Sequence, residues 1–397
     1  MSDQSGDRGT TAPGSAGADR LRRRLVALMD DGGRRGLGPA VLTLLSRVYG
    51  GAMALRADCY ARRLLVRPRR LPATVICVGN LAAGGTGKTP MAVWLARRLQ
   101  RRGLRVAVVS RGYGGRAEKR GGVVSDGRCL RMDAAAGGDE PVLMARSLPG
   151  VPVVVGADRY RAGMLAIRRL DAAVLVLDDA FQHLALERDF NLVLMDAARP
   201  FGNGRILPRG TLREPLSALG RAHAVVLTRA DGLNEALVSR RVAAVAKRAA
   251  PAPVFTAAHD SRPCGLVPVG RREITPGGRT ADAKGLRALA FSGIARNDCF
   301  FQGLVGAGYR LSGRLAFADH HRYADQDRTM ISETARRLGA ELLVTTEKDY
   351  VRFAGRFAWP LPLLVMGVEM RLLAGEDRLL RLLDDCLASS APAHGGV

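Results

Sequence analysis

A glycine-rich segment at residues 79–89 constrains the fold of this chain more than any other stretch. It reads GNLAAGGTGKT, follows an apolar, β-branched run at 74–78, and leads into a helical pattern that begins at Met91. The run before it is typical of a buried strand. A strand, a glycine loop ending in Lys-Thr and a helix, in this order, form the sequence setting of a phosphate-binding loop (P-loop). The segment therefore predicts an α/β domain that binds a nucleotide.

The residue types of this loop suit a phosphate chain. Glycines let backbone amides turn toward phosphates, the helix N-terminus favours anions, Lys88 reaches the β- and γ-phosphates, and the Thr89 hydroxyl can ligate Mg²⁺. The strict pattern has glycine where this chain has Ala82, so the loop is closer to the deviant P-loops, whose extra glycine lies nearer the lysine. An ordinary glycine-rich βα turn is the alternative interpretation. We predict that the nucleotide contacts come from Ala82, Ala83, Gly84, Gly85, Thr86, Gly87, Lys88 and Thr89.

Three acidic groups accompany the loop. Asp178-Asp179 end the apolar run 172–177, Asp139-Glu140 follow two glycines and open a helical stretch, and Asp319-His320-His321 lie far downstream. A P-loop protein needs an acid at the end of a neighbouring strand to organise Mg²⁺ or its waters. A lone acidic pair is more often a solvated surface feature, but its company with a P-loop favours a functional role.

With these motifs the chain resembles the tetraacyldisaccharide 4'-kinases of lipid A biosynthesis, over about residues 70–355. The matching stretches, in the order of the family, are VGNLAAGGTGKTP, SRGYGG, GGDEPVLMA, GADR, LDDAFQHLAL, LPRGTLREPLS, FSGIARNDCFF, FADHHRY and TTEKDYVRF. Ala180 stands where the family more often has glycine. The resemblance implies transfer of the γ-phosphate of ATP, with Mg²⁺, to the 4'-hydroxyl of a tetraacylated glucosamine disaccharide 1-phosphate, which gives lipid IVA.

The resemblance also implies roles for single residues. Asp139 matches the proposed catalytic base and His320 its partner in a dyad, with the adjacent His321 as the alternative. An imidazole that holds or relays the proton helps a carboxylate act on a sugar hydroxyl. The implied metal-organising residues are Thr89, Glu140, Asp178 and Asp179. The implied substrate-binding residues are Arg159, His183, Arg213 and Glu214.

Positive charge and an amphipathic pattern mark the N-terminal region. The chain has 61 Lys and Arg against 37 Asp and Glu, a net charge of +24, which indicates an anionic partner. Genome composition can also raise arginine content, so the charge is permissive evidence only. Between residues 20 and 70 there are 13 arginines and three aspartates, a net charge of +10.

A helix is expected within residues 39–66. Val41, Leu45, Val48, Ala52, Leu55 and Cys59 follow steps of four and three, which puts them on one face. Arg47 and Arg56 interrupt the apolar runs, so no stretch is long enough to span a bilayer. This face either binds an anionic bilayer or packs on the core of the protein. The family's N-terminal helix associates with the inner membrane, so the resemblance favours anionic inner-membrane lipids and a peripheral location on the cytoplasmic face.

The order of elements predicts the fold class and the domains. Strands and helices alternate from 74 to 257, which indicates an α/β, P-loop NTPase-like, mostly parallel sheet with a second, smaller α/β lobe and an N-terminal amphipathic helix. The expected divisions are a disordered tail (1–19), a basic amphipathic membrane-associating segment (20–70), a P-loop kinase domain (71–257), a linker (258–288) and the smaller C-terminal lobe (289–397).

Two alternatives belong to other functional classes. A P-loop GTPase or ATPase switch is suggested by Thr228-Arg229-Ala230-Asp231, which resembles the guanine-reading [NT]KxD motif except for arginine in place of lysine. A basic membrane or nucleic-acid adaptor would have no use for the loop and its acids. The chain has no aromatic RNA-binding motif, and we expect no nucleic-acid partner.

Overall fold

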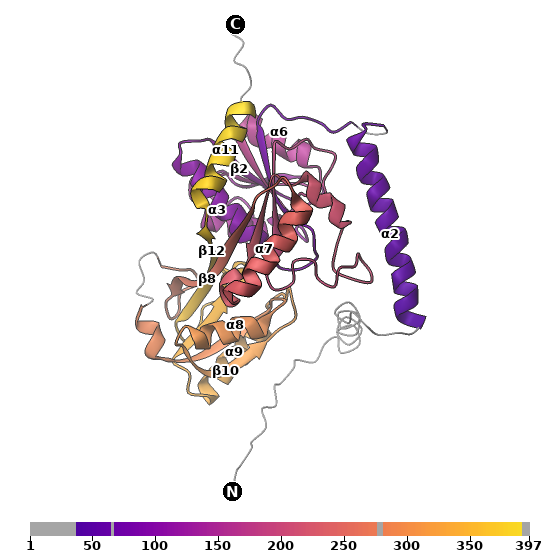
Figure 1. Ribbon diagram of the computed structural model, residues 1–397. Helices are drawn as coiled ribbons and strands as arrows, with labels where there is room; N and C mark the ends of the chain where they lie inside the picture. The colour runs from indigo at the N-terminus through magenta and orange to yellow at the C-terminus, as the bar shows by residue number, and fades with distance from the viewer. Residues whose placement is uncertain (1–36, 65–66, 276–280, 391–397) are drawn as a thin grey trace. The chain divides into compact units, whose positions relative to one another are not determined.

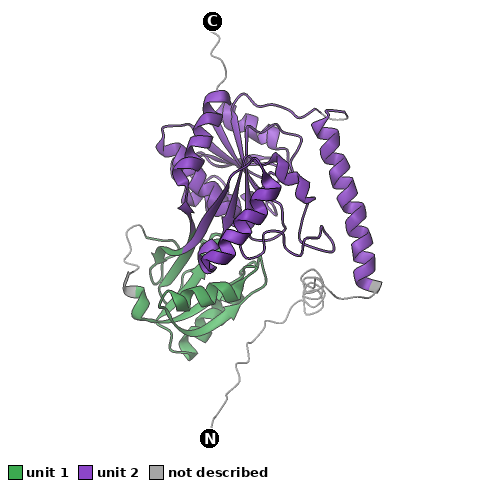
Figure 2. Cartoon of the chain, viewed as in Figure 1, with its two compact units in different colours: residues 1–16, 261–368 green, residues 17–260, 369–397 purple. Residues whose placement is uncertain are grey.

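The computed structural model describes residues 37–64, 67–275 and 281–390. The tail predicted at 1–19 and the basic residues 20–36 lie outside them. The chain divides into two compact units (Figure 2): the larger comprises residues 17–260 and 369–397, and the smaller residues 1–16 and 261–368.

A mostly parallel sheet forms the centre of the larger unit. Neighbouring strands follow the order β3-β4-β2-β5-β1-β6-β7-β8. Their bounds are β1 (Thr74–Asn80), β2 (Val106–Ser110), β3 (Gly122–Ser125), β4 (Val153–Val155), β5 (Val174–Asp178), β6 (Phe190–Asp196), β7 (Ala224–Thr228) and β8 (Val254–Val267). All pairings in this series are parallel except that of β3 with β4. The carboxyl ends of the parallel strands therefore meet at one edge of the sheet.

Helices cover both faces of this sheet. All seven residues of β1 are buried, as expected of a parallel strand without a solvent-facing side. Val75 and Cys77 share a core cluster with Ala162 and Ala166, which lie on α6. The helices that follow β1 in this unit are α3 (Lys88–Arg101), α4 (Ala134–Gly137), α5 (Asp139–Ser147), α6 (Arg159–Leu170), α7 (Glu235–Ala249) and α11 (Glu376–Ser390), with short 3₁₀ turns η1 (Leu216–Arg221) and η2 (Ala230–Gly232).

Helix α2 (Leu37–Ala61) precedes the sheet and is drawn in indigo in Figure 1. It runs through Gly50 and Gly51, which are poor helix formers. The face predicted to be apolar is exposed along the helix: Val41, Leu45, Val48 and Leu55 each expose half or more of their surface. Among the described residues, no helix has the length and apolar character to cross a membrane.

The smaller unit is a second α/β layer structure. Its strands follow the order β10-β9-β11-β12 and pair in parallel. Phe291, Phe353 and Trp359 pack ring on ring in its core. The elements are η3 (Ala281–Gly285), β9 (Arg287–Ser292), α8 (Asn297–Gly306), β10 (Arg310–Ala316), α9 (Asp325–Arg337), β11 (Leu342–Thr346), α10 (Glu347–Phe353) and β12 (Leu363–Ala374). The predicted fold class, with its second lobe and N-terminal helix, is confirmed.

The boundaries between the units differ from the predicted linker at 258–288. Residues 258–267 continue strand β8, and both β8 and β12 run from one unit into the other. The centre of β8 around Ser261 and Arg262 is exposed, so the strand has no continuous hydrophobic pattern by which the sequence could reveal it. Helix α11 belongs to the larger unit, where its Glu376 pairs with Arg98 of α3 at 2.7 Å.

Candidate active site

The predicted P-loop joins β1 to α3 at the carboxyl edge of the larger sheet. Gly84 and Gly87 have φ values of 122° and 85°, which side chains with a Cβ rarely adopt. A Cβ on Gly79 would lie 2.5 Å from Cβ of Phe181, so glycine lets the loop after β5 approach the end of β1. The start of the P-loop is therefore in contact with the segment after β5, which carries the Asp-Asp pair.

Side chains brace the loop from several directions. The buried Asn80 amide donates to the Ala82 carbonyl at 2.6 Å and to the Thr86 hydroxyl at 3.0 Å. Thr228 donates its hydroxyl to the Thr86 carbonyl at 3.0 Å, and Arg229 donates to the Gly85 carbonyl. The segment that resembles a guanine-reading motif therefore supports the backbone of the P-loop.

Asp178 lies at the end of β5, next to β1, and is almost fully buried. Ser110, at the end of β2, donates to its Oδ2 at 3.3 Å, while Oδ1 is buried without a hydrogen-bond partner. Burial, followed by the negative charges of Glu140 and Asp179, raises the pKa of Asp178 to about 7. Because burial and two negative neighbours destabilise its ionised form, the Asp178 carboxylate would be stabilised strongly by a bound cation.

Asp179 faces two cations. Lys88 Nζ lies 3.7 Å from its Oδ1, and Arg213 Nη1 donates to its two oxygens at 3.0 and 3.2 Å. Its own φ of 47° is in the left-handed region, which is uncommon for a non-glycine residue and frequent at functional sites. The structure therefore brings together the lysine of the P-loop, the Asp-Asp pair and the predicted Arg213.

Asp139 and Glu140 form the first turn of α5, after Gly138 with φ 92°. The residues just before this turn lie close to the segment that follows β2. Cβ atoms on Gly112 and Gly115 would lie 3.1 and 2.6 Å from the carbonyl oxygens of residues 137 and 136, so glycine at both positions permits the close approach. Glu140 is close enough to Asp178 to raise its pKa. Glu140 and Asp178 thus belong to one acidic group at this edge of the sheet.

Asp178 and Glu140 are suited to bind Mg²⁺ as the acidic residues of P-loop sites do. The described residues contain no group of three or more His, Cys, Asp or Glu side chains arranged to enclose a metal ion. Mg²⁺ is usually held by one or two carboxylates, waters and substrate phosphates rather than by a protein cage. The unpartnered Oδ1 of Asp178 and the neighbouring Glu140 match that donor set.

The predicted substrate-binding residues differ in their surroundings. Arg159 is buried at the start of α6 and donates to the Gly156 carbonyl at 2.9 Å. Burial, with the positive charges of Arg159 and Arg188, lowers the pKa of His183 to about 4, so its ring is neutral near pH 7. Glu214 is buried in an ion pair with Arg221. Substrate contacts by these residues stay predictions.

Sequence reasoning did not identify Arg188, which holds the loop after β5. Its Nη1 donates to the carbonyls of Ala180, Phe181 and His183, at 3.0, 3.3 and 2.9 Å. Arg188 lies five residues after His183, and no general sequence pattern indicates that an arginine at this position binds the backbone of the preceding loop.

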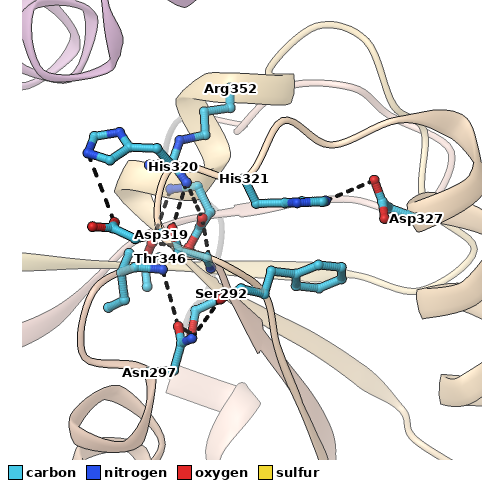
Figure 3. A network of polar contacts seen from close by, with 12 residues as sticks. Ser292, Asn297, Asp319, His320, His321, Asp327, Thr346 and Arg352 are labelled. Carbon is cyan, nitrogen blue, oxygen red and sulfur yellow. Dashed lines mark hydrogen bonds and ion pairs between the residues drawn. The ribbon is translucent and has the colours of Figure 1, made fainter. Parts of the chain in front are cut away.

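His320 and His321, the two candidates for the histidine of the predicted dyad, belong to the smaller unit and are drawn in Figure 3. His320 has φ 61°, donates its backbone N–H to the Gly293 carbonyl, and places Nε2 4.0 Å from Asp319. His321 stacks on Phe317 and lies 3.0 Å from Asp327. His320 is the more exposed of the two side chains, at 48% against 27%. The choice of His320 over His321 as the dyad histidine stays a prediction.

The chain is similar to known proteins over most of its length. The profile of the tetraacyldisaccharide-1-P 4'-kinase family matches residues 39–388. The tetraacyldisaccharide 4'-kinases of Desulfatibacillum aliphaticivorans and Geobacter sulfurreducens are each 44% identical, over 88% of this chain and 94% of their own. The crystal structure of LpxK from Aquifex aeolicus in complex with ATP matches with a TM-score of 0.70 and 30% identity, over 88% of this chain and all of that one. The chain therefore belongs to the tetraacyldisaccharide 4'-kinase family.

Proposed function

We propose that this protein transfers the γ-phosphate of ATP to the 4'-hydroxyl of a tetraacylated glucosamine disaccharide 1-phosphate. The observation that carries the proposal is that Lys88, at the start of α3, lies beside Asp178 and Asp179 at the end of β5. Phosphoryl transfer requires positioning and charge stabilisation more than covalent chemistry, and this group supplies both. The family relatives and the ATP complex of a family member support the same reaction.

The cation site has a defined task in this proposal. Mg²⁺, when bound, neutralises charge that develops on the β- and γ-phosphates. Thr89, Glu140, Asp178 and Asp179 are the residues proposed to hold it or its waters, and Asp179 also orients Lys88 and Arg213. Arg159 and His183, with Arg213 and Glu214, are proposed to organise the disaccharide and its phosphate.

The acceptor hydroxyl needs a base. Asp139 is proposed to accept its proton, and His320 to stabilise or relay that proton. Asp139 begins α5 in the larger unit, and His320 follows β10 in the smaller one. The exposed imidazole of His320 and its left-handed backbone support this assignment, since such strain concentrates at functional sites.

The membrane association proposed for the helix rests on its exposed face. Val41, Leu44, Leu45, Val48 and Leu55 expose between 50% and 65% of their surface. Residues 37–64 carry four arginines and one aspartate. An apolar face amid arginines suits the surface of an anionic bilayer. We therefore propose a peripheral enzyme on the cytoplasmic face of the inner membrane, where ATP and a lipid acceptor meet.

One assay tests the proposed reaction. Purified protein is incubated with γ-labelled ATP, Mg²⁺ and tetraacyldisaccharide 1-phosphate, and label in the lipid is measured. The wild type should label the lipid, and Lys88→Ala should lose the activity because the phosphates lose their positive partner. Lys247→Ala, at an exposed position of α7, is the matched control and should keep it. Equal labelling by the Lys88 and Lys247 variants would remove the P-loop from the reaction.

A further inference from the structure

Helix α2 has a second face, which contacts the rest of the larger unit. Ser46 and Gly50, one helical turn apart, are the buried positions among residues 38–61 of the helix. Ser46 donates its hydroxyl to the Ile206 carbonyl at 2.6 Å, and a Cβ on Gly50 would lie 2.9 Å from Cδ1 of Ile206. Glycine at position 50 therefore lets the helix backbone come close to Ile206, which itself packs on the core of the unit.

Ile206 belongs to a segment that pairs with the P-loop. We call residues 203–213 the strap. Leu212 forms one β-bridge with Ile206, within the strap, and a second β-bridge with Ala82 of the P-loop. Ala83 donates its N–H to the Thr211 carbonyl at 2.7 Å, and the N–H of Arg213 donates to the Leu81 carbonyl at 2.8 Å. The strap therefore lies between α2 and the phosphate-binding loop and is hydrogen-bonded to the loop.

A second connection starts six residues beyond Gly50 on the same helix. Arg56 donates to the backbone carbonyl of Gln182 at 3.2 Å. The Gln182 side chain donates to the Asn80 carbonyl at 2.9 Å, and the Asn80 amide binds the Thr86 hydroxyl at 3.0 Å. This route also ends in the P-loop, after three consecutive hydrogen bonds.

We propose that docking of α2 on the strap and on Gln182 positions the P-loop, so that the helix contributes to nucleotide affinity separately from its membrane face. Two independent contact routes from one helix converge on residues 80–86, and the strap also delivers Arg213 to Asp179. By linkage, a helix that favours the nucleotide-binding form of the loop is itself held more firmly when nucleotide is bound. The inference rests on the nucleotide site of the proposed function.

Matched glycine variants of α2 test the proposal. Gly50→Val places a branched side chain against Ile206, whereas Gly51→Val meets nothing within 4 Å of its Cβ and changes helix propensity equally. Dissociation constants for Mg²⁺-ATP are measured by titration calorimetry, together with melting curves and sedimentation with anionic vesicles. We expect Gly50→Val to weaken ATP binding about tenfold, within the usual range of coupling between sites. Gly51→Val should bind ATP like the wild type, and both variants should sediment with vesicles.

A second pair of matched variants, with substitutions at Arg56 and Arg47, keeps the test decisive if Gly50→Val does not fold. Arg56→Gln removes the contact with Gln182, and Arg47→Gln removes the same charge from an exposed position. Hydrogen exchange of residues 41–60 is measured with and without Mg²⁺-ATP. ATP should slow exchange in the wild type and in Arg47→Gln, and less so in Arg56→Gln. Identical ATP affinity and exchange in both members of each folded pair would overturn the inference, whereas failure of the wild type to bind ATP would overturn the nucleotide site itself.

Discussion

Arg213 donates to both carboxylate oxygens of Asp179, at 3.0 and 3.2 Å, while Lys88 Nζ lies 3.7 Å from the same carboxylate. One carboxylate thus orients a cation from the P-loop and another from the strap. Each of these side chains is exposed by less than a third, so the pairs are partly shielded from solvent.

Removing Arg213 should therefore change the chemistry more than the stability. In Arg213→Ala, Asp179 loses the cation that binds both of its oxygens, and it draws Lys88 away from the phosphates. We expect kcat to fall by roughly one to two orders of magnitude, and the free energy of unfolding to fall by no more than ~1 kcal/mol, as for partly exposed ion pairs. Steady-state kinetics and urea unfolding measure the two effects. Arg131→Ala, which breaks an exposed pair with Asp126, should alter neither kcat nor KM. A comparable kcat in the two variants would contradict the role of Arg213.

The proposed dyad makes a kinetic prediction. Asp139→Ala and His320→Ala should each lower kcat by about 10² to 10⁴, the range of general base catalysis, with little change in the KM for ATP. The double variant should be little slower than the slower single variant, because groups that act as one unit are not additive.

His321→Ala serves as the control for the dyad. His321 stacks on Phe317 and pairs with Asp327, so its loss should lower the melting temperature while kcat per folded molecule stays near the wild type. A normal kcat in His320→Ala together with a large loss in His321→Ala would move the role one residue along. Normal rates in both would exclude histidine from the step.

The lowered pKa of His183 makes stability depend on acid. Its folded pKa is about 4 against an ordinary value of 6.5, so the unfolded chain binds a proton that the folded chain excludes at intermediate pH. The stabilising contribution is complete above pH 6.5 and is lost as the pH falls toward 4. Between pH 7.5 and 4.5 the wild type should lose ~1 kcal/mol more free energy of unfolding than His183→Gln, after allowance for solvent screening. Urea unfolding at both pH values checks this. Parallel losses in the two proteins would show that another group carries the acid sensitivity.

The exposed face of α2 should decide membrane binding. Leu44, Val48 and Leu55 expose 62%, 65% and 65% of their surface, and replacing all three by serine removes apolar contact with a bilayer. Affinity for anionic vesicles should fall more than tenfold, given about 1.5–3 kcal/mol for each apolar side chain buried. Sedimentation with vesicles at low and high salt measures the loss and the arginine contribution. Val269→Ser, at an exposed position of the smaller unit, is the control. Vesicle binding by the triple variant equal to that of the control would place the anchor elsewhere.

Local sequence determined the parts of the site whose geometry is set within a few residues. The β-branched run of β1, the glycines at positive φ and Lys88 at the start of α3 specify a P-loop, because backbone sterics and helix N-termini act locally. The apolar spacing of α2 likewise predicted which side chains share a face, whereas the exposure of that face came from the structure. The acids at the end of β5 could be assigned to the same edge as the loop, because carboxyl ends of parallel strands meet there.

Only the tertiary structure decided which of these residues have partners. Arg213, Arg188 and Arg229 are three of many arginines in the sequence, and their contacts with Asp179, residues 180–183 and Gly85 depend on loops folding back over long sequence separations. The same holds for Gly50, whose contact with Ile206 joins segments 156 residues apart. The continuation of strand β8 over residues 258–267 escaped prediction because the exposed centre of the strand lacks a hydrophobic period. Side-chain chemistry therefore follows from the sequence alone, whereas the selection of partners follows from packing, which no local pattern records.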